Sequence, residues 1–350
     1  MNSSFKPEDV TLLLKDITGQ MEPLPTAERE RRIQGGAHYS EMLPLEYRPT
    51  EEYTALYEKA LAVYGQRTAD AAAALGEKII RKKGERAVIV SLARAGTPVG
   101  VLVRRYIRGK YGIDCPHYSV SIIRDRGMDR NAMAYILQRH RAEDLQFLDG
   151  WTGKGVIYRE LRKEIASFPG VSDELAVAAD PAGLTEMCGT HEDIIIPSSC
   201  LNCTVCGLIS RTVLKEGLIG EKDFHGAVYY GELAAEDRTY EFIDTVEARF
   251  RFGTEPREEE YRGPAGMDTV REIEREYGVR DIHFIKPGIG ETTRVLLRRV
   301  PWKVLIDPER KNDGELEPVR QLAREKQVDI EYYPLGNYKC CGIIRKLPDI

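Results

Sequence analysis

The chain of 350 residues carries a net charge of -5, with 42% hydrophobic and 31% charged residues. This balance is typical of a folded globular protein and excludes both a strongly basic nucleic-acid-binding chain and a disordered acidic chain. No apolar run approaches the roughly 20 residues of a membrane span, so the sequence predicts a cytoplasmic protein without a membrane partner.

The first two thirds of the sequence alternate between helical and strand patterns. Residues 1–50 are polar and punctuated by Gly and Pro, and we expect a lead-in without core elements. Apolar spacing predicts a long helix over 52–83, and a β-branched run predicts a buried strand over 87–92. Further helices are expected at 97–112, 131–140 and 156–168, and further strands at 116–123, 145–149 and 174–180. This alternation predicts an α/β fold with a parallel sheet, in which ligands bind beyond the carboxyl ends of the strands.

The last third is predicted to form a second domain. The charged stretch 252–266, rich in Pro and Gly, is typical of a linker between a domain of residues 1–251 and a domain of residues 267–350. In the second domain we expect a helix at 267–278, a strand, glycine loop and helix over 280–300, a strand at 303–309, a helix at 314–327 and a strand at 329–335. This order predicts a compact α/β/α sandwich.

Three of the predicted strands are followed by glycine-containing loops whose residues could bind an anion. In "DGWTGKG", residues 152–155 could present backbone N–H groups to a phosphate at a helix N-terminus, although an ordinary turn and helix start fits equally well. In "SLARAGTP", Arg94 and Gly96 are suited to a second phosphate, and the charged loop "RDRGMDR" could close over an anion. Each segment taken alone is compatible with a plain connection, but their conjunction favours a phosphate-binding crevice.

These segments resemble those of the type I phosphoribosyltransferases. More closely, the chain is similar to the bacterial StiP family of cysteine proteases, also described as a phosphoribosyltransferase-like domain of tellurium-resistance and stress-response gene clusters. The similarity extends from about residue 4 to 250 and rests on "HYSEM", "VSLARAGTPVGVLVRR", "PHYSVSIIRDRG", "FLDGWTGKG", "DPAGL", "PSSCLNCTV", "GLISRTVL" and "DFHGA".

The resemblance implies a type I phosphoribosyltransferase-like parallel sheet that binds phosphoribosyl pyrophosphate with Mg²⁺ and transfers the phosphoribosyl group to an unknown acceptor. It assigns Asp149 to the ribose hydroxyls, and Arg124 and Arg126 to closure over the pyrophosphate. The implied substrate-binding residues are Ser91, Arg94, Gly96, Thr97, Trp151, Thr152, Gly153, Lys154 and Gly155. A non-catalytic nucleotide sensor is an alternative use of the same crevice.

A cysteine cluster supports a second alternative, a cysteine protease or other hydrolase. Cys200 lies in "PSSCLNC", and "DFHGA" supplies His225, which is the minimum pair for thiol catalysis if the two side chains meet. A buried structural cysteine is the plainer interpretation of Cys200. Together with Cys203 and Cys206, and with Cys188 or His191 as a fourth ligand, Cys200 could also bind zinc or an iron–sulfur cluster.

The second domain resembles the L7Ae and Pelota RNA-binding domains. "GIGETTR" stands where those proteins often have G-x-N-E-x-[ST]-[KR], with Gly290 in the place of the asparagine. The stretch from Lys286 to Lys303 contains five basic residues and one acidic residue, Glu291. Contacts with phosphates require such a local excess of positive charge, although a solvated helix face is also compatible with it. The expected RNA-binding residues are Lys286, Gly288, Gly290, Glu291, Thr292 and Arg294.

Overall fold

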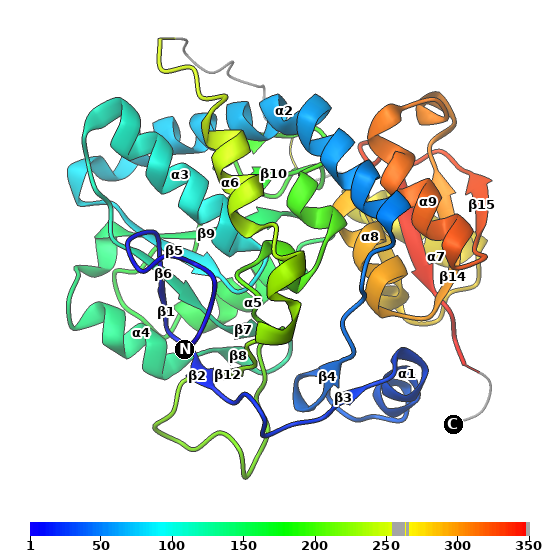
Figure 1. Ribbon diagram of the computed structural model, residues 1–350, viewed down its shortest axis with the longest axis horizontal. Coiled ribbons are helices and arrows are strands. Elements are labelled where there is room, and N and C mark those ends of the chain that lie inside the picture. The colour runs from blue at the N-terminus through cyan, green and yellow to red at the C-terminus, as the bar shows by residue number, and fades with distance from the viewer. Residues whose placement is uncertain (254–262, 264–265, 348–350) are drawn as a thin grey trace.

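The computed structural model describes residues 1–253, 263 and 266–347 and shows a mixed α/β protein built around two sheets (Figure 1). The larger sheet has six strands in the order β1-β6-β5-β9-β10-β11, and every neighbouring pair is parallel. Its strands are β1 (Thr11–Leu12), β5 (Val88–Leu92), β6 (His117–Val120), β9 (Leu145–Trp151), β10 (Leu175–Ala179) and β11 (Cys188–Thr190). The predicted parallel sheet is therefore confirmed.

Helices cover both faces of this sheet. The apolar residues of α2, α3 and α6 pack against one face, and those of α4 and α5 pack against the other. The bounds are α2 (Glu51–Lys83), α3 (Gly96–Tyr111), α4 (Arg130–Leu137), α5 (Val156–Ile165) and α6 (Thr239–Glu247). The α2 helix begins at the cap residue Thr50, whose hydroxyl accepts from the Tyr53 N–H at 3.1 Å, and it ends at Gly84 in a left-handed conformation.

Residues 266–347, which we call the second unit, form a four-stranded sheet in the order β13-β16-β14-β15. The elements are α7 (Gly266–Glu276), β13 (Ile285–Pro287), α8 (Ile289–Arg298), β14 (Pro301–Ile306), α9 (Glu317–Glu325), β15 (Asp329–Tyr332) and β16 (Cys340–Ile344). Apolar residues of α7 pack on one face, and those of α8 and α9 pack on the other. The sequence pattern missed β16, which lies between β13 and β14 and pairs with both.

The expectation that residues 1–50 contribute no core element is wrong. The edge strand β1 extends the large sheet, and Ile17 and Leu43 are fully buried. The segment also forms α1 (Thr26–Gln34) and three short strands. Of these, β2 (Lys15–Asp16) pairs with β12 (Gly226–Ala227), and β3 (Pro23–Leu24) pairs with β4 (Leu43–Pro44). Two further short strands, β7 (Ile122–Ile123) and β8 (Gly127–Met128), form an antiparallel pair.

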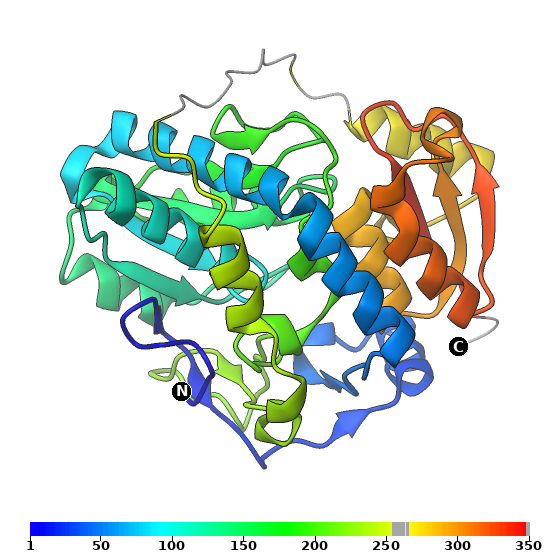
Figure 2. The ribbon, with the colours of Figure 1, turned by 45° about the horizontal axis from the view of Figure 1, so that its top comes forward.

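The second unit packs directly on the larger sheet and its helices. In both ribbon views α2 extends across the larger part of the molecule to α9 (Figure 2). A single apolar cluster joins Ile194 and Ile196 to Ile289 and Leu296 of α8. Most of the predicted linker, 252–266, falls outside the described residues, so the domain boundaries stay a prediction. Within the described residues, none of the helices has the length and apolar character needed to cross a membrane.

Candidate functional site

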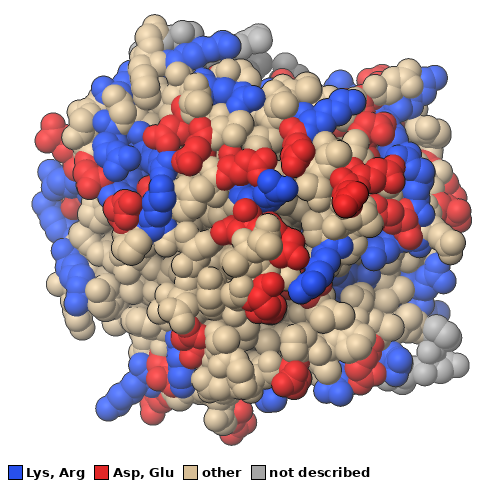
Figure 3. Space-filling view, viewed as in Figure 1, with Lys and Arg blue, Asp and Glu red and all other residues tan. Residues whose placement is uncertain are grey.

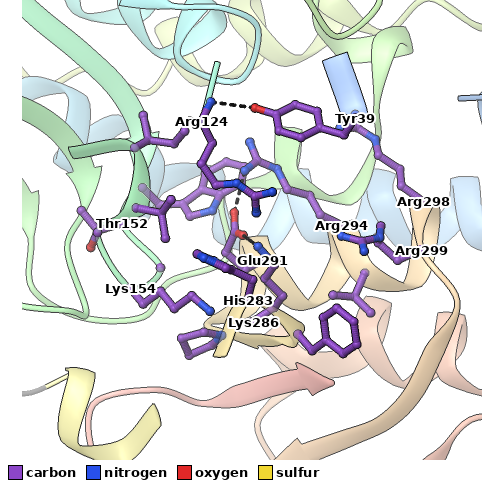
Figure 4. A pocket seen from close by; sticks show the side chains of 18 of the residues that line it. Tyr39, Arg124, Thr152, Lys154, His283, Lys286, Glu291, Arg294, Arg298 and Arg299 are labelled. Atoms are coloured by element: carbon purple, nitrogen blue, oxygen red, sulfur yellow. Dashed lines mark hydrogen bonds and ion pairs between the residues drawn. The ribbon is translucent and has the colours of Figure 1, made fainter. Parts of the chain in front are cut away.

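A cavity of about 290 Å³ lies where β9 ends, between the large sheet and the second unit. Figure 4 shows the side chains gathered around it, with Thr152 and Lys154 on one side and Arg298 and Arg299 on the other. Its basic lining residues are Arg29, Arg124, Lys154, Arg211, Lys286, Arg294, Arg298 and Arg299, and its acidic ones are Asp149, Asp281 and Glu291. On the face shown in Figure 3, by contrast, basic and acidic side chains are interspersed.

The predicted phosphate loop, residues 152–155, does border this cavity, and Gly155 has the left-handed φ of +77° that a glycine permits. The second unit holds the loop, however. The Lys154 ammonium donates to the backbone carbonyls of Ile282 and of Ile285, the latter at 2.8 Å. The Tyr338 hydroxyl donates to the Gly153 carbonyl at 2.7 Å. The loop thus contacts the C-terminal unit through the Lys154 side chain and the Gly153 carbonyl, and phosphate binding by its backbone N–H groups stays a prediction.

The other predicted substrate residues divide into two groups. Asp149, Trp151 and Arg124 line the cavity, and burial raises the pKa of Asp149 to about 6. Ser91 and Thr97 are buried side chains that bond within the core, to His117 at 2.7 Å and to Ser119 at 2.8 Å.

The predicted pyrophosphate loop is also engaged within the protein. Arg94 lines a second, smaller cavity of about 170 Å³, where it pairs with Glu46 at 3.2 Å. Gly96 packs on the main chain of β9, since a Cβ there would lie 2.7 Å from the Leu148 carbonyl oxygen. Arg126 pairs with Glu41 and does not line the larger cavity. The Mg²⁺ expected with the pyrophosphate stays a prediction, and a lining dominated by cations does not favour a bare divalent cation.

The basic residues of the cavity crowd one another. Arg29 is 1% exposed, and burial together with the charges of Arg211 and Arg299 lowers its pKa to about 9. Burial lowers the pKa of Arg211 to about 10 and that of Lys154 to about 7. Sequence reasoning missed both residues. Arg29 comes from a segment treated as a lead-in, and Arg211 lies in "GLISRTVL", to which no site role was assigned.

Only half of the predicted RNA-binding residues reach the cavity. Lys286, Glu291 and Arg294 line it, and the Arg294 guanidinium lies 4.6 Å from the centre of the Trp151 ring. The other three are Gly288, Gly290 and Thr292, which are buried. A Cβ on Gly290 would lie 2.2 Å from the Trp151 ring, so this part of the predicted RNA surface is covered by the large sheet's own loop.

The predicted catalytic pair Cys200 and His225 is not brought together. Cys200 is fully buried, burial raises its thiol pKa to about 12, and its carbonyl accepts from the Tyr53 hydroxyl at 2.8 Å. The His225 imidazole instead lies 2.8 Å from the Ser121 hydroxyl. Cys203 and Cys206 are also buried, and none of the three cysteines belongs to a group of metal-ligating side chains among the described residues. In this structure Cys200 has the environment of a structural thiol.

A different cysteine and histidine do meet. The Cys188 sulfur lies 3.4 Å from His191 Nε2, and His191 Nδ1 lies 3.6 Å from a carboxylate oxygen of Asp180. Asp180 follows the carboxyl end of β10, and Cys188 begins the neighbouring strand β11. The ligand atoms of these three residues all lie within 4.8 Å of one another, a set that could hold a zinc ion or form a nucleophile, base and orienting acid.

This Cys188–His191–Asp180 cluster is linked to the cavity. The other carboxylate oxygen of Asp180 accepts from the hydroxyl of the cavity residue Thr152. The sequence predicted Cys188 and His191 only as alternative metal ligands; their i, i+3 spacing was the signal for a direct pair.

Comparisons with known proteins identify two segments. Residues 3–247 match the family model described as tellurite-like stress resistance cysteine protease StiP, and residues 264–346 match that of the PELOTA RNA binding domain. A protein named Cysteine protease StiP, from Acinetobacter baylyi (strain ATCC 33305 / BD413 / ADP1), is 34% identical over 368 aligned residues, which cover 99% of this chain and 94% of that protein. No solved structure matches the chain.

These matches overturn the main functional prediction. The matching family and the relative are named as cysteine proteases, and nothing in the comparisons names phosphoribosyl transfer. The prediction of a phosphoribosyltransferase is therefore wrong. The physical reason lies in the 152–155 loop, whose glycine and lysine pattern serves contacts with the second unit.

Proposed function

The chain belongs to the StiP family, and we propose that it is a cysteine hydrolase that cleaves peptide bonds with Cys188 as the nucleophile. The observation that carries the proposal is the 3.4 Å approach of the Cys188 sulfur to His191 Nε2. Of the six histidines, all of which lie in the described part of the chain, His191 is the one with a contact to a cysteine sulfur.

The three side chains supply the parts of a thiol mechanism. His191 takes the proton from Cys188, and the resulting thiolate attacks the carbonyl carbon of a peptide bond. The C–N bond then breaks, the amine leaves with the proton from the imidazolium, and a thioester remains on Cys188. Water, activated by His191, hydrolyses the thioester and restores the thiol. Asp180 orients the imidazole and stabilises its charged form.

Burial sets a condition on this chemistry. Cys188 is 1% exposed, whereas the His191 side chain is 20% exposed. A substrate carbonyl can reach the sulfur only if the side chains packed around Cys188 move aside. We therefore expect alkylation of Cys188 by a small reagent such as iodoacetamide to be faster than alkylation of the fully buried Cys200.

The test compares two conservative serine variants in an assay of casein hydrolysis. Cys188→Ser should abolish hydrolysis, because a hydroxyl of ordinary pKa is a poor nucleophile beside this base. Cys200→Ser is the matched control and should retain hydrolysis if it remains folded, as checked by circular dichroism. Retained hydrolysis in folded Cys188→Ser would refute the proposal, and so would one bound zinc per wild-type chain that is lost in Cys188→Ser.

We also propose RNA binding by the second unit, because residues 264–346 match the PELOTA model. In fold terms, we propose that the large sheet follows the type I phosphoribosyltransferase arrangement and the second unit the L7Ae arrangement. The parallel strand order of the large sheet supports the first part of this proposal, and the helix-covered mixed sheet of the second unit supports the second part. A retarded band for short RNA with the full chain, lost on Lys286→Met, would support RNA binding, and no retardation at low salt would refute it.

A further inference from the structure

Three arginines of the large cavity have no carboxylate partner among the described residues. Arg29, Arg211 and Arg298 form no ion pair there, whereas Arg299 is held by Glu30 at 2.6 Å and Arg294 by Glu291 at 2.6 Å. Arg211 lies over the Tyr39 ring at 4.1 Å from its centre. Arg29 is buried, and Arg211 and Arg298 are half-buried. Because removing charges from water without a counter-charge is costly, three such arginines around one cavity indicate an anion.

The polar atoms of the cavity lining that lack a hydrogen-bond partner indicate which groups the anion must carry. The cavity residues that have buried polar atoms without a partner include Arg29, at Nε and Nη1, Arg298, at Nε, and His283, at Nδ1. The arginine nitrogens can only donate, and the imidazole nitrogen can do so in one tautomer. The lining therefore calls for a ligand rich in acceptors, and a carboxylate or phosphate meets that need.

We propose that this cavity binds the terminal phosphate monoester of a nucleotide, held by Arg29, Arg211 and Arg298. A monoester carries about two negative charges and three terminal oxygens at neutral pH, which suits three converging guanidinium groups better than a single carboxylate does. Arg29 and Arg211 lie outside the 152–155 loop, so the site does not depend on that loop.

The nucleotide could be free or the end of an RNA strand. A volume of about 290 Å³ is at the lower end of pockets for small ligands and admits one terminal group rather than a continuous duplex. Because Lys286 and Arg294 of the PELOTA-matching segment line the same cavity, an RNA end is reachable from the second unit. The proposal goes beyond the hydrolase, since binding is measured without any peptide cleavage.

The experiment uses Trp151 as its own reporter. The chain has two tryptophans, so Trp302→Phe leaves Trp151 as the source of indole fluorescence from within the cavity lining. In this background, the full chain is titrated with adenosine 5′-monophosphate, with a short RNA bearing a 5′-phosphate and with the same RNA bearing a 5′-hydroxyl. Saturable fluorescence changes are expected for the phosphorylated ligands.

Variants assign the binding to the arginines. The double substitution Arg29→Met and Arg211→Met should weaken binding by about 10- to 100-fold, the usual effect of removing hydrogen bonds to a charged group. Arg31→Met, on the exposed side of the same helix α1, should leave the dissociation constant unchanged. Equal affinity for the free and the RNA-linked monoester would identify a free nucleotide as sufficient, and tighter RNA binding would identify the strand end.

Three results would overturn the proposal. The first is no saturable change with either phosphorylated ligand, the second is unchanged affinity in the folded double variant, and the third is equal affinity for the 5′-hydroxyl RNA. Circular dichroism of each variant separates loss of binding from loss of fold.

Discussion

Replacing Arg29 with methionine is expected to make the ligand-free protein more stable. Arg29 is 1% exposed, and its Nε and Nη1 have no partner, while Nη2 donates to the Arg298 carbonyl. Burial and two neighbouring arginines lower its pKa to about 9. Methionine keeps much of the side-chain volume and removes the charge that causes this cost.

The magnitude follows from that pKa. Lowering the pKa of Arg29 to about 9 corresponds to a penalty of about 5 kcal/mol for the charged group in the folded state. Loss of the hydrogen bond to the Arg298 carbonyl offsets about 1.5–3 kcal/mol of this. The variant should therefore gain about 2–3.5 kcal/mol in free energy of unfolding. Because the folded pKa is the lower one, the penalty is complete below pH 9 and disappears only as pH rises to the ordinary pKa of an arginine.

Urea denaturation at pH 6, 7 and 8 measures this difference, which should be the same at all three values. Arg31→Met is the control, since Arg31 is exposed and its pairing with Glu28 contributes little. A variant less stable than the wild type by 1 kcal/mol or more would show that Arg29 is retained for structure and would refute the reasoning. Added phosphate monoester should stabilise the wild type and leave Arg29→Met nearly unchanged.

Two further predictions concern the fold. Gly290→Ala should destabilise the protein by about 1–3 kcal/mol and shift Trp151 fluorescence, because the added Cβ would meet the indole ring; an unchanged melting curve and spectrum would contradict this packing. Asp9→Asn should cost about 3 kcal/mol at pH 7, because it breaks the buried pair with Arg105 at 2.7 Å. Although burial opposes ionisation, hydrogen bonds from Arg105 and Tyr240 lower the pKa of Asp9. The stability that Asp9 contributes is thus present above pH 4 and is lost as pH falls through the folded pKa. Denaturation curves of the wild type and the variant should therefore converge in acid. Curves that stayed apart would refute the role given to the Asp9–Arg105 pair.

Local patterns predicted the helices and strands well where one face or one run of apolar residues dominated. The helix over 52–83 and the strand over 87–92 correspond to α2 and β5 within a residue. The strand β16 escaped because its "CCGII" core contains a glycine and follows a turn-like "GNYK", so its pairing with two other strands decides its conformation. Tertiary pairing of this kind leaves no periodic signal in the segment itself.

The site was predicted less well than the fold, for a reason visible in its residues. The loop 152–155 and Arg124 were found from local chemistry, and they do line the cavity. Arg29 and Arg211 are separated by 182 positions (211 minus 29), and only the packing of α1 brings them to one cavity. For Cys200 the plainer interpretation, a buried structural cysteine, agrees with its complete burial, whereas its separation from His225 depends on tertiary packing that the sequence does not show.

The burial of Gly288, Gly290 and Thr292 changes how fragments of this protein should be interpreted. If residues 264–346 were produced alone, the first turn of α8, which faces Trp151 in the whole chain, would become solvent-exposed. In such a fragment nucleic acid could contact a surface that is buried in the intact chain, and the newly exposed apolar side chains would promote self-association. Affinities from the excised segment would then describe an artificial surface, whereas in the intact chain the expected RNA-binding residues that line the cavity are Lys286, Glu291 and Arg294.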